Sequence, residues 1–281
     1  MKGDWQLGKL DLDGLSQAAR LIRIEVCRMF GRVGQGHFGG ALSCADIVAA
    51  LYFHELRLRP EEPDWPERDR FIMSKGHGAP SHYIALGEKG FFPKEWWEQY
   101  EKLGAALNTH PNMLKIPGVD FSAGSLGHGL SVGVGMALAA RQDKRSYRTY
   151  VLLGDGECNE GSVWEAAMCA AHYHLDNLVA IVDRNYLMVD GCTEQVMGLE
   201  PLEQKWNAFG WCTEVIDGHD LEAILNAFDN ARKHAAGPYA IIANTVKGKG
   251  VSFMEGRREW HGNEITPEEL TQALRELEGT A

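Results

Sequence analysis

An acidic residue between two glycines, followed thirty positions later by an asparagine, is the most specific chemical signal in the sequence. Asp155 lies in Gly154–Gly156, between an apolar run that predicts a strand and a pattern that predicts a helix. Asn185 follows the next apolar run, so both would lie at the carboxyl ends of neighbouring parallel strands, where ligands bind. With the carbonyl of Leu187 they would form an incomplete oxygen set that suits Mg²⁺ and substrate phosphates. The tripeptide alone is more typical of a tight turn closed by an Asx hydrogen bond, and the asparagine favours the metal site.

A second glycine-rich segment and four histidines are further candidates for such a site. Residues 123–129, AGSLGHG, precede a predicted helix, whose backbone N–H groups would suit an anion or a flat ring. Close helix packing is the alternative explanation of these glycines. Four histidines stand beside glycine or proline, where imidazole can transfer protons or donate to phosphate, although each alone would more often be a surface or packed residue. They are His37, His77, His110 and His261.

Alternating patterns along the chain predict the framework that would position these residues. Apolar runs typical of buried strands alternate with helical patterns, which predicts a parallel sheet covered by helices on both faces. The strands are expected at 70–74, 147–153, 177–183, 213–217 and 239–245. The helices are expected at 11–32, 43–54, 130–141, 160–174, 220–234 and beginning at Pro267. We therefore predict a doubly wound, mostly parallel α/β fold, as a single domain over residues 1–281.

Two of these helices carry capping signals at their starts. Ser43 is expected to cap the helix that continues through His54, with Asp46 in its first turn. Thr266 and Glu269 have the spacing of a capping box, with a proline at the first helical position between them. Both signals predict where the helices begin.

The charge balance excludes several classes of function. Lys and Arg number 28 and Asp and Glu 39, a formal net charge of −11, which disfavours nucleic acid and anionic membrane surfaces. The longest uncharged stretch, 121–140, is too polar for a membrane helix, and the polar N-terminus does not resemble a signal peptide. The six cysteines have no zinc-like spacing and are expected to be reduced. We expect a cytoplasmic protein that binds neither nucleic acid nor membranes.

Taken in order, the motifs resemble the diphosphate-binding domain of transketolases, which are thiamine-diphosphate enzymes. The resemblance covers nearly the whole chain and implies the thiamine-diphosphate-binding fold. The segments that carry it are GQGHFGGALS at 34–43, RFIMSKGHG at 70–78, THP at 109–111, AGSLGHG at 123–129, GDGECNEGSVWEA at 154–166, VDRNYLMVDG at 182–191 and TVKGKGVSF…EWHG at 245–262.

The resemblance also implies a role for each candidate residue. The metal that bridges the diphosphate, Mg²⁺ or Ca²⁺, would be held by Asp155, Asn185 and the carbonyl of Leu187. Contacts to thiamine diphosphate would come from seven residues, Gly156, His77, His261, Gly124, Ser125, Leu126 and Asn185. The substrate channel and its proton transfers would involve His37, His110 and His261, with help from His77. Glu160, with Glu165 one helical turn later, would face the interface at which the cofactor is shared.

The resemblance leaves out two parts of a whole transketolase. Transketolases have a second domain, which binds the aminopyrimidine ring and carries the activating glutamate, and a third, C-terminal domain. We therefore expect the N-terminal subunit of a split transketolase, which joins a C-terminal partner subunit in an α₂β₂ heterotetramer if the usual pairing is kept. Ser125 and His128, in place of the proline and glutamine of single-chain enzymes, resemble the two-polypeptide variants. Arg184, beside Asn185, is basic, whereas many members of the family have an acidic residue or an asparagine at this position. We expect this difference not to alter metal ligation, because the ligand would be Asn185.

The implied reaction moves a two-carbon ketol unit from a ketose phosphate to an aldose, as in pentose phosphate metabolism. One alternative is a specialised two-subunit transketolase for an unusual catabolic sugar, and another is an orphan cofactor-binding or regulatory module. A third is the α-subunit of 2-oxo-acid dehydrogenases, which shares Gly-Asp-Gly but lacks the GHxGG and KGHG histidines of this sequence.

Overall fold

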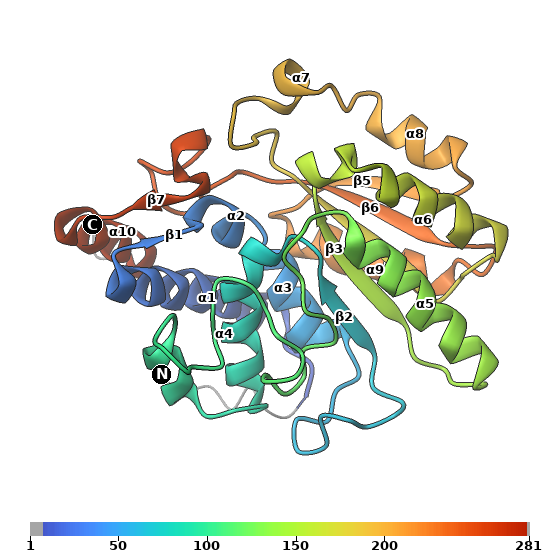
Figure 1. Ribbon diagram of the computed structural model, residues 1–281, viewed down its shortest axis with the longest axis horizontal. Coiled ribbons are helices and arrows are strands. Elements are labelled where there is room, and N and C mark those ends of the chain that lie inside the picture. Colours follow the sequence, from blue (N-terminus) through green and yellow to red (C-terminus); the bar gives the residue numbers. More distant parts are fainter. Residues whose placement is uncertain (1–7, 280–281) are drawn as a thin grey trace.

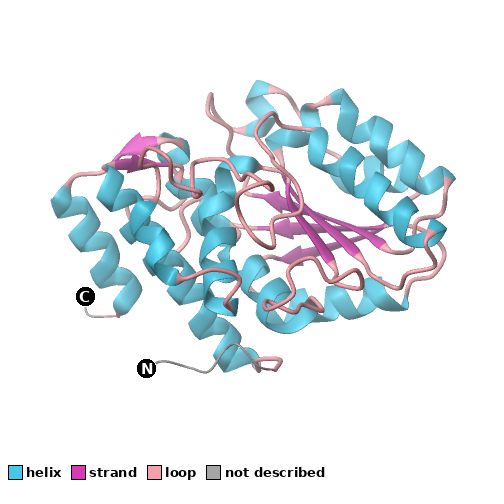
Figure 2. Cartoon of the chain, turned by 60° about the horizontal axis from the view of Figure 1, so that its bottom comes forward, coloured by secondary structure: helices cyan, strands magenta, loops and turns pink. Residues whose placement is uncertain are grey.

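The computed structural model describes residues 8–279 and contains a five-stranded parallel sheet between two layers of helices (Figures 1 and 2). The strand order is β2-β3-β4-β6-β5. The strands are β2 (Arg70–Met73), β3 (Thr149–Gly154), β4 (Leu178–Arg184), β5 (Cys212–Asp217) and β6 (Tyr239–Asn244). A separate antiparallel pair joins β1 (Gln35–Gly36) to β7 (Asn263–Glu264). The predicted α/β fold with a parallel sheet is confirmed.

Helices cover both faces of this sheet because its strands carry apolar side chains on both sides. In β3, Tyr150 and Leu152 pack into the core that contains α1, α3, α4 and α9, whereas Val151 and Leu153 pack against α5, α6 and α8. The helices are α1 (Leu12–Val33), α2 (Phe38–Ser43), α3 (Ala45–Ala50), α4 (Ala79–Lys89), α5 (His128–Gln142), α6 (Gly161–His172), α7 (Thr193–Val196), α8 (Leu202–Ala208), α9 (Leu221–Lys233) and α10 (Pro267–Glu278).

The predicted helix over 43–54 is wrong in its start and in its continuity. Ser43 ends α2 instead of capping a helix, because its hydroxyl donates to the buried carboxylate of Asp183 at 2.6 Å. The chain turns at Cys44, continues as α3, and ends in a π-helical turn over Leu51–Glu55. Asp46 forms an ion pair with Arg23 of α1. A long-range polar contact therefore outweighs the local capping signal.

Other sequence signals are found where they were expected. Thr266 and Glu269 form the capping box of α10, with reciprocal hydrogen bonds of 2.9 and 3.2 Å. The six cysteines are all free thiols. No helix among residues 8–279 combines the length and the apolar composition needed to cross a membrane.

Buried His82 makes the stability of this fold depend on pH. It lies on α4, 1% exposed, with Nε2 2.5 Å from the Tyr52 hydroxyl. Burial lowers the pKa of His82 to about 3, whereas an unfolded histidine titrates near about 6.5. Below about pH 6.5 the unfolded chain binds a proton at this histidine that the folded chain does not. The contribution of His82 to the free energy of unfolding is therefore fully present above about pH 6.5 and declines as the pH falls.

We expect the variant His82→Gln to lose this contribution to the pH dependence. One proton corresponds to about 1.4 kcal/mol of unfolding free energy per pH unit. Urea unfolding between about pH 6 and pH 5 should therefore have a slope against pH that is shallower by about that amount in His82→Gln. An unchanged slope would contradict the neutral, buried state of His82.

Candidate functional site

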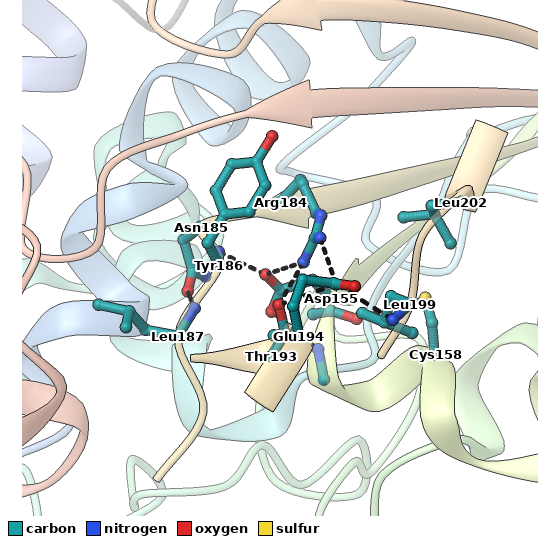
Figure 3. A network of polar contacts seen from close by, with 12 residues as sticks. Asp155, Cys158, Arg184, Asn185, Tyr186, Leu187, Thr193, Glu194, Leu199 and Leu202 are labelled. Atoms are coloured by element: carbon teal, nitrogen blue, oxygen red, sulfur yellow. Dashed lines mark hydrogen bonds and ion pairs between the residues drawn. The ribbon is translucent and has the colours of Figure 1, made fainter. Parts of the chain in front are cut away.

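The carboxyl ends of β3 and β4 bring the two predicted metal ligands together. The register of the two strands pairs Gly154 with Asp183. Asp155, one position after Gly154, and Asn185, two positions after Asp183, therefore lie at the same edge of the sheet. Asp155 is 3% exposed, and its carboxylate accepts from the backbone N–H of Gly156 at 2.7 Å and of Tyr186 at 2.6 Å. Figure 3 shows Asp155 beside Tyr186, the residue that follows Asn185 in the loop after β4. The turn therefore orients the carboxylate from two directions.

Asn185 is held with its amide oxygen toward the same loop. Its Nδ2 donates to the carboxylate of Asp183 at 3.2 Å, and its Oδ1 accepts from the backbone N–H of Leu187 at 3.2 Å. Between them Tyr186 adopts a positive φ of 66°, which turns the chain sharply and sets Leu187 beside the site. The three residues that carry the carboxylate, amide and carbonyl oxygens thus line one cavity.

This donor set fits a hard divalent cation that a ligand completes. Within residues 8–279 no cluster of three His, Cys, Asp or Glu side chains could hold a metal unaided, so the amide and carbonyl oxygens would be needed. Burial and the neighbouring Asp183 raise the pKa of Asp155, which means that its charged form lacks full compensation and favours a nearby cation. The residues present therefore fit the metal that the sequence implies.

Asp183 is the centre of a buried polar network beneath these ligands. It is inaccessible to solvent and accepts from Lys75 Nζ at 2.5 Å, from the Ser43 hydroxyl at 2.6 Å and from Thr245 Oγ1. Burial alone would lower the pKa of Lys75, but Asp183 and its hydrogen bond raise it above its ordinary value. The pair is therefore charged at neutral pH and joins four separate segments of the chain.

Glu157 connects the two glycine-rich motifs that the sequence analysis singled out. Its buried carboxylate accepts from the Ser74 hydroxyl and from the backbone N–H groups of Gly127 and Gly154, both at 2.9 Å. Gly127 has a φ of +84°, and a Cβ there would lie 2.6 Å from that of Glu160. Glycine is therefore required where segment 123–129 approaches the turn at Asp155.

Three of the four predicted histidines form a cluster above the ligands. The ring centroids of His37, His77 and His261 are 5.5, 5.8 and 4.9 Å apart in the pairs 37–77, 37–261 and 77–261. Burial lowers the pKa of all three, with further lowering by nearby cationic groups, and brings that of His261 to about 3. His110 is exposed and lies beside Gly76. The cluster is therefore neutral at neutral pH, so each ring can both donate and accept a hydrogen bond.

Lys247 is a functional candidate that the sequence analysis missed. Its side chain is 2% exposed, donates to the carbonyl of Leu187 at 2.8 Å and lies 3.0 Å from Nδ1 of His261. Burial lowers the pKa of Lys247 to about 8. A divalent cation bound to the Leu187 carbonyl would compete with this ammonium group. The Lys247 ammonium group therefore lies where the structure favours a positive charge.

These residues surround a cavity of about 230 Å³ at the carboxyl edge of the sheet. Of the predicted residues, those that line it are His77, Leu126, Asp155, Gly156, Glu160, Asn185, Leu187 and His261. His37 lies beside the cavity in the histidine cluster, whereas Gly124, Ser125 and His110 are exposed and lie outside its lining. Three further residues, Lys75, Glu157 and Lys247, line it as well. The only sequence signal for them is position, since Lys75 and Lys247 follow strands and Glu157 follows the Gly-Asp-Gly motif.

Comparison with known proteins identifies the family to which this site belongs. The family model described as "Transketolase, thiamine diphosphate binding domain" matches residues 15–280. The 6-deoxy-6-sulfo-D-fructose transketolase subunit SqwG of Clostridium sp. (strain MSTE9) is 44% identical over 264 residues, which are 94% of this chain and 96% of that protein. One subunit of the apulose-4-phosphate transketolase of Phocaeicola vulgatus is 44% identical over 272 residues, 97% of this chain and 95% of that protein.

Whole transketolases match over only part of their length. The transketolase of Pongo abelii is 39% identical over 278 residues, which are 99% of this chain and 44% of that protein. The crystal structure of transketolase from Campylobacter jejuni superposes with a TM-score of 0.91 at 29% identity, covering 96% of this chain and 43% of that one. The chain thus spans less than half of these larger proteins.

Because the ion pair between Lys75 and Asp183 is fully buried, we expect removal of one partner to be more damaging than removal of both. Lys75→Met leaves a buried, unpaired carboxylate and should lower the free energy of unfolding by about 3–5 kcal/mol. The double variant Lys75→Met/Asp183→Asn should recover much of that loss. Denaturant unfolding of the single and double variants measures this, and strictly additive losses would contradict the pairing.

Proposed function

Because the chain belongs to the transketolase family, we propose that it is the N-terminal subunit of a two-polypeptide transketolase. It would form one diphosphate-binding domain over residues 1–281, with the pyrimidine-binding and C-terminal domains on a partner subunit. The observation that carries this proposal is the cavity in which the Asp155 and Asn185 oxygens meet the histidine cluster. Two relatives that are named as transketolase subunits have nearly the same extent as this chain, which supports the division into subunits.

We assign the diphosphate and its metal to the part of the cavity that Asp155, Asn185 and Leu187 line. Asp155, Asn185 and the Leu187 carbonyl would hold Mg²⁺, with Ca²⁺ as the alternative, since both accept such ligands. Thiamine diphosphate, when bound, would supply the carbanion stabilisation that ketol transfer requires. We assign the contacts to thiamine diphosphate to seven residues, Gly156, His77, His261, Gly124, Ser125, Leu126 and Asn185.

The neutral histidines suit proton transfer at the reacting oxygen of the substrate. A lowered pKa keeps His37 and His261 uncharged at neutral pH, so each can donate its ring N–H to the substrate oxygen and offer its other nitrogen as a hydrogen-bond acceptor. His110 stands at the exposed side of the cluster and would act where the sugar enters. Glu160, at the cavity wall and the start of α6, would face the shared cofactor in an α₂β₂ assembly.

The substrates would be a ketose phosphate donor and an aldose acceptor in the cytoplasm. A specialised role in the breakdown of an unusual sugar is the second candidate. It is favoured by the names of the subunit relatives, which refer to a sulfo-fructose and to apulose 4-phosphate instead of the sugars of pentose phosphate metabolism. The acidic net charge of −11 supports the expectation that nucleic acid is not a partner.

A calorimetric titration tests the shared site directly. Thiamine diphosphate with Mg²⁺ is titrated into the chain alone and into its mixture with a candidate C-terminal subunit. We expect tight binding only in the mixture, accompanied by ketol transfer from a ketose phosphate. Absence of binding in both would overturn the proposal for that partner, and tight binding to the chain alone would overturn the shared site.

The metal assignment is tested by Asp155→Ala and Asn185→Ala in the same mixture. Each removes an oxygen ligand, so metal-dependent cofactor affinity should fall by more than about 100-fold. Asn230→Ala, on the exposed face of α9, is the matched control and should bind as the wild type does. Wild-type cofactor affinity in either ligand variant would refute the assignment.

His37→Ala separates proton transfer from cofactor binding. Because His37 lies in the histidine cluster but outside the cavity lining, the variant should bind thiamine diphosphate normally. Its turnover should fall by about 10²- to 10⁴-fold, the usual contribution of a general acid or base. His234→Ala, at the end of α9, is the control, and wild-type turnover in His37→Ala would remove this histidine from the catalytic set.

A further inference from the structure

Arg184 makes an unusual set of contacts at the edge of the metal site. It ends β4, immediately before Asn185, and its side chain is 1% exposed. Nη1 lies 3.3 Å from Oδ2 of Asp155 and donates to the Thr193 hydroxyl at 2.7 Å. Figure 3 shows the guanidinium group between Asp155 on one side and Glu194 on the other. A buried arginine thus touches a proposed metal ligand directly.

The other half of the guanidinium group binds two glutamates on the loop that follows. Nη2 donates to Glu194 at 2.9 Å and to Glu200 at 2.8 Å. Glu194 in turn accepts from the backbone N–H of Leu199 at 3.1 Å and of Glu200 at 3.2 Å, while Glu200 accepts from that of Leu202 at 2.9 Å. Arg184 therefore connects the end of β4 to the far end of the loop.

This loop has little apolar attachment to the core, although Lys247 and Arg258 also donate to its backbone carbonyls. Of residues 186–200, only Thr193 and Leu199 are buried. Several of its apolar side chains point into solvent, with 60% exposure at Val189 and 61% at Met197. A segment with so little apolar burial opens easily unless polar contacts hold it. Because it carries the Leu187 carbonyl, its order bears directly on the metal site.

The acidic groups around Arg184 more than compensate its positive charge. A lone buried guanidinium beside Asp155 would repel a divalent cation, and a lone buried charge is costly. Glu194 and Glu200 supply two negative charges to the same guanidinium group, so its positive charge is compensated without Asp155. Asp155 can therefore keep its own negative charge for the metal while its orientation is fixed.

Resting on the proposed function, we propose that Arg184 is a positioning residue that sets the affinity of this site for its divalent cation. It joins the Asp155 carboxylate and the loop 186–200 into one unit, so that the Leu187 carbonyl is already in place when the metal and the diphosphate arrive. Arg184 does not touch the reacting atoms. Its effect should appear in metal affinity and in the order of the loop.

Two substitutions test this inference. Arg184→Met keeps the length of the side chain and removes every polar contact, whereas Glu194→Gln/Glu200→Gln keeps Arg184 and removes its compensating charges. Arg59→Met, whose guanidinium stacks on Trp65 and pairs with Glu62 at the surface, is the matched control. Mg²⁺ is titrated by calorimetry into the complex of the chain with its partner subunit, in the presence of thiamine diphosphate. Amide hydrogen exchange of residues 186–200 is followed without metal or cofactor.

We expect Mg²⁺ affinity to fall by about 10- to 100-fold in Arg184→Met, as for other groups that orient metal ligands. Exchange within 186–200 should accelerate, and turnover at saturating Mg²⁺ and cofactor should be largely retained. The double glutamine variant should also bind Mg²⁺ more weakly and exchange faster, and it decides the matter if Arg184→Met does not fold. Arg59→Met should match the wild type.

Two outcomes separate failure of this inference from failure of the proposed function. Wild-type Mg²⁺ affinity in the variants, with a wild-type protein that binds metal and cofactor normally, would overturn the role of Arg184. A wild-type protein that binds neither would instead overturn the proposed function. Weaker metal binding with unchanged exchange in 186–200 would also overturn the inference, because the loop would not be the element that Arg184 positions.

Discussion

The buried ion pair between Lys75 and Asp183 is the interaction on which the geometry of the site depends. The two charges lie at the ends of β2 and β4 with almost no exposure to solvent, so neither is tolerable without the other. The Asp183 carboxylate also accepts hydrogen bonds from the Asn185 amide, which it orients, and from the hydroxyl groups of Ser43 and Thr245. Because four segments converge on one carboxylate, the ligands above it are placed before any cofactor binds.

Sequence reasoning predicted the five strands of the parallel sheet and the closeness of Asp155 and Asn185 because both follow from local patterns, whereas it did not predict α4 or α8. Apolar runs alternating with helical patterns are sufficient to predict a parallel sheet, and a parallel sheet places all of its carboxyl ends at one edge. Asp155 and Asn185 each stand just after such a run, so their proximity required only that β3 and β4 be neighbours. The capping box of α10 was equally local and equally predictable.

What the sequence did not reveal depends on contacts between distant segments. Ser43 has the local signature of a helix cap, but its partner is Asp183, 140 positions away. Glu157 joins Ser74, Gly127 and Gly154, and nothing in the spacing of these residues indicates that they meet. The same holds for Arg184, whose contacts with Glu194 and Glu200 depend on the path of the loop beyond it. Buried polar partners are chosen by the tertiary fold, not by neighbouring residues.

The distribution of burial within the site is consistent with a cofactor that is held from two sides. The groups assigned to the metal and diphosphate, such as Asp155 and Asn185, are buried and fully oriented by this chain. Gly124, Ser125 and His110, assigned to the rest of the cofactor and to the sugar, are instead exposed. A ligand bound only by this chain would leave those contacts open to water, which weakens hydrogen bonds and exposes reactive intermediates. A second protein surface over the exposed side would remove that weakness, and this is the physical reason for expecting a partner subunit.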